Sequence, residues 1–176
     1  MEFQSDGLHN ICRIKVTLLE SDPPIWRRFE VSDDITLRKL HSILQAVMGW
    51  ENSHLYEFYK GKNYLSKTLT LSQVAPRARS KIFYLYDMGD SWEHEILVEK
   101  VIRNQEGKAR PVCLEGQMAC PPEDCGGIWG YDEMLAAMED PDHPDREHWL
   151  EWIGDDFDPA AFDLEAVNKR LRRFKP

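Results

Sequence analysis

The sequence predicts an α+β fold, and three of its features carry that prediction. Several segments alternate apolar and polar residues, one segment has apolar residues three and four positions apart, and the last third is acidic with helical spacing. The order strand, strand, helix, strand, hairpin suits an antiparallel or mixed sheet crossed by one helix, in a β-grasp-like arrangement. We expect one domain over 1–176, with the sheet and helix over about 10–110 and a cysteine loop and helical subdomain over 111–176.

The first two predicted strands form a hairpin. Residues 11–19 alternate, and Ile14, Val16 and Leu18 share one face, which is the pattern of a half-buried strand. Two prolines at positions 23 and 24 then interrupt the chain, because proline fixes φ and has no N–H for a strand ladder. Extended structure resumes over 25–31.

The most strongly predicted helix covers residues 36–50. Asp34 or Thr36 can cap its N-terminus, and Gly49 can end it in a left-handed conformation. Its apolar residues recur with three-four spacing and define one buried face: Leu37, Leu40, Ile43, Leu44, Val47 and Met48.

The remaining elements follow from the same patterns. Strands are predicted at 55–59, 81–87 and 91–102, with a tight turn at 87–90, and residues 69–74 form a short element of undetermined type. In 91–102 one face carries Trp92, His94, Ile96 and Val98, and the other carries Glu93, Glu95 and Glu99. Helices are predicted at 131–139, 144–153 and 164–174.

Charge divides the chain into three parts. Residues 1–119 carry 16 acidic and 16 basic side chains, residues 120–165 carry 15 acidic and one basic, and residues 166–176 carry five basic. Because an acidic surface repels phosphate, broad nucleic-acid binding is disfavoured, and a protein or peptide is the expected partner. No apolar run approaches a membrane span and the first 30 residues lack a signal-peptide pattern, so we expect no membrane association and a cytoplasmic location.

The cysteines suggest a structural zinc site. Cys113, Cys120 and Cys125 fall within 13 residues, and such clusters bind metal in reducing compartments more often than they form disulfides. His94 or Cys12 can supply a fourth ligand, and we expect His94, because its strand lies just upstream. Buried unliganded thiols and redox-active cysteines are the alternatives.

The predicted turn at 87–90 and the strand after it concentrate ionisable groups. Asp87, Asp90, Glu93, His94 and Glu95 have the chemistry to hold a divalent ion or to place a general base beside an acid. The competing interpretation is structural, since aspartates commonly cap turns and the glutamates can face water.

Further residues are candidates for binding. Trp26, Arg27 and Arg28 combine an aromatic ring with two cations, which can recognise a carboxylate or phosphate, although both arginines can instead pair with the acidic C-terminal half. His54, beside Trp50 and Tyr56, can line a groove, and Trp92 is a further candidate binding residue.

Five motifs together resemble the plasmid ORF-3-like family of root-inducing plasmids, over about residues 10–173. They lie at 23–28 (PPIWRR), 48–55 (MGWENSHL), 86–95 (YDMGDSWEHE), 120–127 (CPPEDCGG) and 157–162 (FDPAAF). The resemblance implies a compact α+β domain. It supplies no catalytic residues, although some members resemble proteins labelled resolvase- or repressor-like, and we expect this chain to lack the extra DNA-binding module of some relatives.

Two functional hypotheses follow. The first is a non-enzymatic binding or adaptor module whose C-terminal segment is fixed by the cysteine loop, with zinc held by Cys113, Cys120, Cys125 and His94. The second is a metal-dependent hydrolase or nuclease of mobile elements that uses the residues between Asp87 and Glu95.

Overall fold

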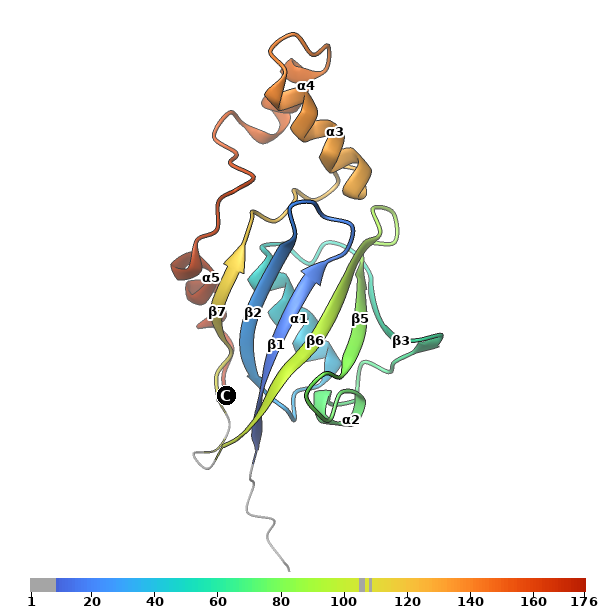
Figure 1. The fold of residues 1–176 in the computed structure, drawn as a ribbon, viewed down its shortest axis with the longest axis vertical. Coiled ribbons are helices and arrows are strands. Elements are labelled where there is room, and N and C mark those ends of the chain that lie inside the picture. The colour runs from blue at the N-terminus through green and yellow to red at the C-terminus, as the bar shows by residue number, and fades with distance from the viewer. Residues whose placement is uncertain (1–8, 105–106, 108) are drawn as a thin grey trace, which may run out of the picture.

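A computed structural model describes residues 9–104, 107 and 109–176, and it is built on one antiparallel sheet (Figure 1). The strand order is β4-β3-β5-β6-β1-β2-β7, and every strand pair in the described residues is antiparallel. The α+β class is confirmed, and the finer β-grasp-like arrangement is not. The strands are β1 Asn10–Leu18, β2 Ile25–Ser32, β3 Tyr56–Lys60, β4 Asn63–Tyr64, β5 Lys81–Tyr86, β6 Trp92–Arg103 and β7 Val112–Gln117.

The core lies between the sheet and α1 (Leu37–Met48), which crosses behind the strands in Figure 1. Buried and half-exposed residues alternate along β1, so Ile14 and Val16 are fully buried against the helix side, as predicted. Burying such a side chain stabilises a fold by about 1.5–3 kcal/mol. The central position of β1 and β6, the longest strands, therefore anchors the whole sheet.

The ends of α1 follow the sequence prediction. The Thr36 side chain accepts a hydrogen bond from the Lys39 backbone N–H at 3.2 Å, which caps the first turn. At the other end Gly49 has φ +112°, in the left-handed region that glycine adopts without a Cβ clash.

Two arginines from distant segments also cap the carboxyl end of α1. Arg27 Nε donates to the carbonyl oxygen of Val47 at 3.0 Å, and Arg170 Nε donates to that of Ala46 at 2.8 Å. The last carbonyl groups of a helix have no partner within the helix, and cations there complement its dipole. Strand β2 and the C-terminal helix are thus both tied to the same helix end.

The edge strand β7 was not predicted, and it extends the sheet past the expected boundary at residue 110. It pairs with β2 and packs beside α5 (Leu164–Leu171). The Asn168 side chain occupies its outer edge: the Cys113 N–H donates to Asn168 Oδ1, and Asn168 Nδ2 donates to the Cys113 carbonyl, both at 2.9 Å. A side-chain amide here takes the place of a neighbouring strand.

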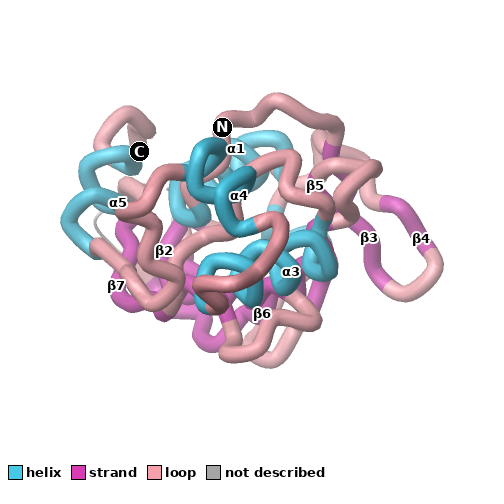
Figure 2. The backbone as a smooth tube through the Cα atoms, turned by 90° about the horizontal axis from the view of Figure 1, so that it is seen from above, coloured by secondary structure: helices cyan, strands magenta, loops and turns pink. Residues whose placement is uncertain are grey.

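The other helices occupy the ends of the sheet. Figures 1 and 2 show α3 (Gly127–Glu139) and α4 (Arg146–Ile153) beyond the end where the β1–β2 and β5–β6 connections lie. Residues 71–74 form the short helix α2 (Leu71–Val74). None of the helices in the described segments combines the length and apolar composition required to cross a lipid bilayer.

Candidate functional site

The cysteine-rich loop folds back over the β5–β6 turn. The Trp50 indole N–H donates to the Pro121 carbonyl at 3.1 Å, and the Gly126 N–H donates to Asp90 Oδ2 at 3.1 Å. The approach is close, because a Cβ added to Gly127 would lie 2.3 Å from the Asp90 carbonyl oxygen. Loop, turn and the end of α1 therefore enclose one corner of the molecule.

His54 lies at the centre of this corner, in the segment between α1 and β3. Its Nε2 is 3.0 Å from Asp124 Oδ1, 3.5 Å from Asp87 Oδ2 and 3.7 Å from Glu123 Oε2. This nitrogen is buried and has no well-aligned hydrogen bond in the described residues. The donor atoms of His54, Asp87 and Asp124 all lie within 4.8 Å of one another. We call these three residues and Glu123 the His54 cluster.

Two of the carboxylates use one oxygen for the fold and turn the other towards His54. Asp87 Oδ1 accepts from the Gly89 N–H at 2.8 Å and so holds the β5–β6 turn, in which Asp87 has φ +60°. Glu123 Oε1 accepts from the Glu51 N–H at 2.7 Å and from the Tyr86 hydroxyl at 3.0 Å. The fold thus fixes both side chains, and their second oxygens converge on a single imidazole nitrogen.

The His54 cluster is bordered both by buried groups and by an open hollow. Burial and the hydrogen bond to Glu123 raise the pKa of Tyr86 above its usual value, so its hydroxyl stays protonated and donates. Asp124 is 68% exposed, and a hollow of about 470 Å³ borders the cluster. Its lining includes Trp50, Ser53, Pro121, Glu123, Asp124 and Phe157.

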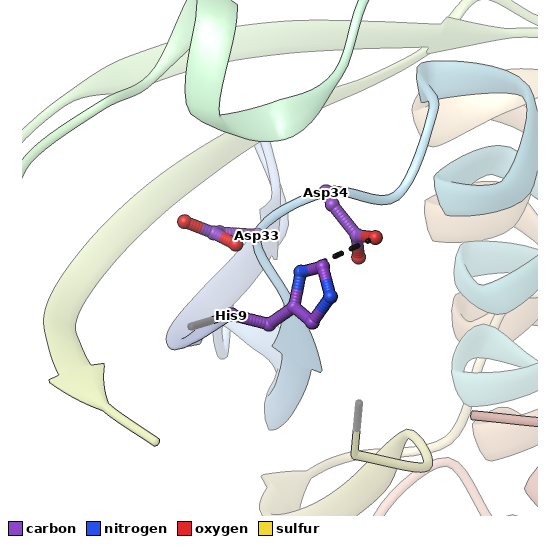
Figure 3. Close-up of side chains that lie close together, drawn as sticks. All are labelled: His9, Asp33 and Asp34. Carbon is purple, nitrogen blue, oxygen red and sulfur yellow. Dashed lines mark ion pairs between the residues drawn. The ribbon is translucent and has the colours of Figure 1, made fainter. Parts of the chain in front are cut away.

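A second group of metal-ligating side chains is formed by His9, Asp33 and Asp34 (Figure 3). His9 Nδ1 lies 3.5 Å from Asp34 Oδ2, while both Asp33 oxygens accept from Asn10, at 3.2 Å from its N–H and 2.9 Å from its side chain. Since Asp33 is already used to connect β1 with the segment after β2, the His54 cluster is the better candidate.

The predicted site residues of the second hairpin lie in different environments in the structure. Asp87 belongs to the His54 cluster and Asp90 binds the Gly126 N–H. Glu93 and Glu95 lie on the opposite face of the sheet, where Glu95 accepts from Lys81 Nζ at 2.9 Å. His94 is fully buried, and burial lowers its pKa to about 4. The five residues therefore do not form one site, because β-strand side chains alternate between faces.

The predicted zinc ligands are not brought together either. No group of three or more His, Cys, Asp or Glu side chains with donor atoms within 4.8 Å includes a cysteine or His94, in the part of the chain that the structure describes. The Cys113 thiol lies 3.5 Å from the Arg28 carbonyl oxygen, and that of Cys125 lies 3.9 Å from the Gly127 carbonyl oxygen. Burial raises the pKa of Cys113, and it raises that of Cys125 to about 12, so both remain thiols at neutral pH.

The candidate binding residues other than His54 have different environments. Arg27 is 2% exposed and caps α1, while Arg28 pairs with Glu99 on β6 and Glu115 on β7 rather than with the acidic C-terminal half. Trp26 lies on the sheet face opposite α1, within 5.0 Å of the Arg28 guanidinium. Trp92, a candidate binding residue, is fully buried and so offers no surface to a ligand.

Sequence reasoning missed Glu123 and Asp124. They lie in the Cys-Pro-Pro-Glu-Asp-Cys motif, which was considered only for its thiols. Two adjacent carboxylates in a proline-constrained loop are the signal that could have identified them. Their proximity to His54 depends on a contact across about 70 residues, which no local pattern predicts.

Comparisons with known proteins agree with this architecture. The family model described as plasmid pRiA4b ORF-3-like protein matches residues 10–166. The uncharacterized protein y4hQ of Sinorhizobium fredii is 40% identical over 177 residues, covering 92% of this chain and 91% of that protein. The crystal structure of MM3350 from Methanosarcina mazei, a protein of unknown function, is 35% identical with a TM-score of 0.74, covering 90% of this chain and 98% of that one. The chain therefore belongs to the plasmid pRiA4b ORF-3-like family.

Proposed function

We propose that the chain is a divalent-cation-dependent binding module whose ion is held by the His54 cluster. The observation that carries the proposal is the convergence of three carboxylate oxygens on the buried Nε2 of His54, which makes no well-aligned hydrogen bond within the described residues. Uncompensated carboxylates repel one another, so a cation at this point stabilises the arrangement. A transition metal such as Zn²⁺ suits one imidazole with carboxylate ligands.

An ion at this position would join three segments that are distant in sequence. His54 follows α1, Asp87 directly follows β5, and Glu123 and Asp124 belong to the cysteine-rich loop. Ligation would therefore add to the stability of the folded loop, because the separated ligands of an unfolded chain bind the ion weakly. The module would present its loop surface to a partner only when the ion is bound.

Isothermal titration of EDTA-stripped protein with Zn²⁺ at neutral pH tests this proposal. We expect saturable binding of one equivalent, which His54→Ala abolishes and which His148→Ala, a matched change at an exposed histidine on α4, leaves intact. A Cys120→Ser, Cys125→Ser double variant should also retain it. Zn²⁺ binding that survives His54→Ala but is lost in the cysteine variant would instead favour the zinc site predicted at the thiols.

Absence of saturable binding in the wild-type protein would reject the metal proposal. The contacts of His54 with Asp124 and Asp87 would then be structural only, and His54→Ala would lower stability without changing the affinity for any metal.

A metal-dependent hydrolase is the second candidate function, and the hollow beside the cluster favours it. Three protein ligands would leave coordination positions for water, which a bound metal activates at neutral pH. Its residues would be His54, Asp87 and Asp124 rather than the run from Asp90 to Glu95. Zn²⁺- or Mn²⁺-dependent cleavage of bis(p-nitrophenyl) phosphate should then disappear in Asp87→Asn. Activity that is equal in the two proteins would reject this function.

A further inference from the structure

Trp129 is the most exposed large apolar side chain in the described part of the chain. It lies in the first turn of α3 and is 81% exposed. Indole rings bury large apolar areas in most folds, and tryptophan is enriched among residues that dominate protein interfaces. An indole held in water on a well-packed helix is thus a candidate for contact with another molecule.

The surrounding backbone packs closely on the helix turn that carries this ring. A Cβ added to Gly130 would lie 1.9 Å from the Cys125 carbonyl oxygen, and one added to Gly127 would lie 2.3 Å from that of Asp90. The first turn of α3 is therefore pressed against the cysteine-rich loop and the β5–β6 turn, as its position in Figure 1 shows. Trp129 therefore projects from a closely packed helix turn.

A hollow of about 500 Å³ lies beside the ring. Trp129, Ile128 and Leu19 supply apolar lining, and Glu20, Asp90 and Glu93 supply carboxylates. No lysine, arginine or histidine lines it, and none of the three carboxylates forms an ion pair within the described residues. Apolar walls, an indole face and unneutralised negative charge are therefore combined at one point.

We propose that this hollow docks an arginine or lysine side chain from a basic segment of a partner protein. The cationic head group would lie over the indole face, which attracts cations, and near the carboxylates, while its aliphatic stem would contact Leu19 and Ile128.

The charge of the adjacent helices extends the same complementarity. Residues 127–158 carry 11 carboxylates, all exposed, and a single basic residue, Arg146. A phosphate-bearing partner would be repelled by this surface, whereas a segment with several arginines or lysines would be attracted along α3 and α4. The surface therefore favours a basic protein segment over a nucleic acid.

The test measures fluorescence anisotropy of a labelled Arg-Gly repeat peptide at low ionic strength, with EDTA present so that the His54 cluster plays no part. We expect Trp129→Ala to weaken binding about tenfold. Trp152→Ala, at an exposed tryptophan of α4 outside this hollow, should change it by less than about twofold. Glu20→Gln combined with Glu93→Gln should weaken binding and reduce its salt dependence.

Three results would overturn the proposal. One is equal affinity of the wild-type and Trp129→Ala proteins, and another is an equal loss in Trp129→Ala and Trp152→Ala, since both would mean diffuse attraction to acidic helices. The third is displacement of the peptide by spermine at comparable concentration, which would assign the hollow to small polycations. Circular dichroism of each variant verifies that the fold is retained.

Discussion

Arg27 illustrates how one residue can carry a structural role that its neighbour in sequence lacks. Its guanidinium is buried and donates to three carbonyl oxygens, those of Val47, Trp26 and Gln117, at 2.8–3.0 Å. Burial lowers the pKa of Arg27 from its ordinary value, although arginine remains charged. Arg28 instead lies at the surface of the sheet, paired with Glu99 and Glu115.

Replacing these two arginines should therefore have unequal effects. Arg27→Met removes the donor of one buried and two partly buried hydrogen bonds to carbonyl oxygens and should lower the free energy of unfolding by about 2–5 kcal/mol. Arg28→Met removes two partly exposed ion pairs, to Glu99 and Glu115, and should cost about 1 kcal/mol or less. Urea unfolding monitored by tryptophan fluorescence measures both, and similar losses would contradict this view of α1 capping.

His94 and His41 make stability depend on pH. Burial lowers the pKa of each to about 4, from an ordinary value of 6.5. Between these values the unfolded chain binds protons that the folded protein does not, so stability falls as the pH falls from 6.5 to 4. Each histidine contributes up to about 1.4 kcal/mol per pH unit in this window.

His94→Leu should therefore reduce the slope of unfolding free energy against pH. The comparison uses the slope between pH 4.5 and 6.5, because the packing cost of the substitution shifts all values equally and the carboxylates titrate in both proteins. Wild-type and variant proteins with the same slope would show that the His94 ring is already protonated in the fold.

Helix α3 can pack closely on the cysteine-rich loop and the β5–β6 turn because two of its residues are glycines without a Cβ. Gly130→Ala would place a methyl group against the Cys125 carbonyl and should lower stability by about 2 kcal/mol or more. Gly61→Ala is the control for backbone strain without steric overlap: this glycine has φ +60°, whereas Gly130 is helical, and no atom lies within 4 Å of the Cβ added at Gly61. Its cost should be limited to about 1 kcal/mol of backbone strain. Thermal unfolding decides between these values, and equal losses would mean that α3 tolerates displacement.

Elements with a strong internal pattern could be predicted from the sequence, and elements defined by their neighbours could not. α1 has its cap, its apolar spacing and its terminating glycine within one segment, so the prediction was accurate. β7 contains Glu115 and Gly116 and becomes a strand through its pairing with β2. α3 begins at Gly127, earlier than predicted, because the loop and turn pack closely around its glycines.

Considering the whole molecule, the alkylation rate of its cysteines measures how readily the fold opens. Cys12, Cys113 and Cys125 are at most 4% exposed, and burial raises their pKa, to about 12 for Cys12 and Cys125. Alkylation with iodoacetamide at pH 8 should therefore be slow in the native protein and rapid in urea, since it requires both exposure and thiolate formation. Rapid, selective labelling of one native thiol, read by mass spectrometry, would revive the redox interpretation.

The candidate site could be predicted only in part, because its residues come from segments that are far apart in the sequence. His54 and Asp87 were recognised as chemically capable residues, but their meeting with Glu123 and Asp124 is decided by tertiary folding. The cysteine loop packs on the turn of the second hairpin, but the ligands predicted for this region were the thiols and His94 rather than His54, Glu123 and Asp124. Periodicity reports which face a residue occupies, and it contains no information about partners on distant segments.

The side-chain amide of Asn168 should limit self-association of this protein through the edge of its sheet. The edge strand of a sheet normally has free N–H and C=O groups that can pair with a strand of another molecule. Here the N–H and C=O of Cys113 are instead hydrogen-bonded to the side-chain amide of Asn168 in the same chain. Asn168→Leu would remove this amide while keeping the helix. The free edge of β7 should then pair with that of another molecule, and light scattering of concentrated samples should detect the association. Unchanged monodispersity in that variant would mean that the bulk of α5 alone shields the border of the sheet.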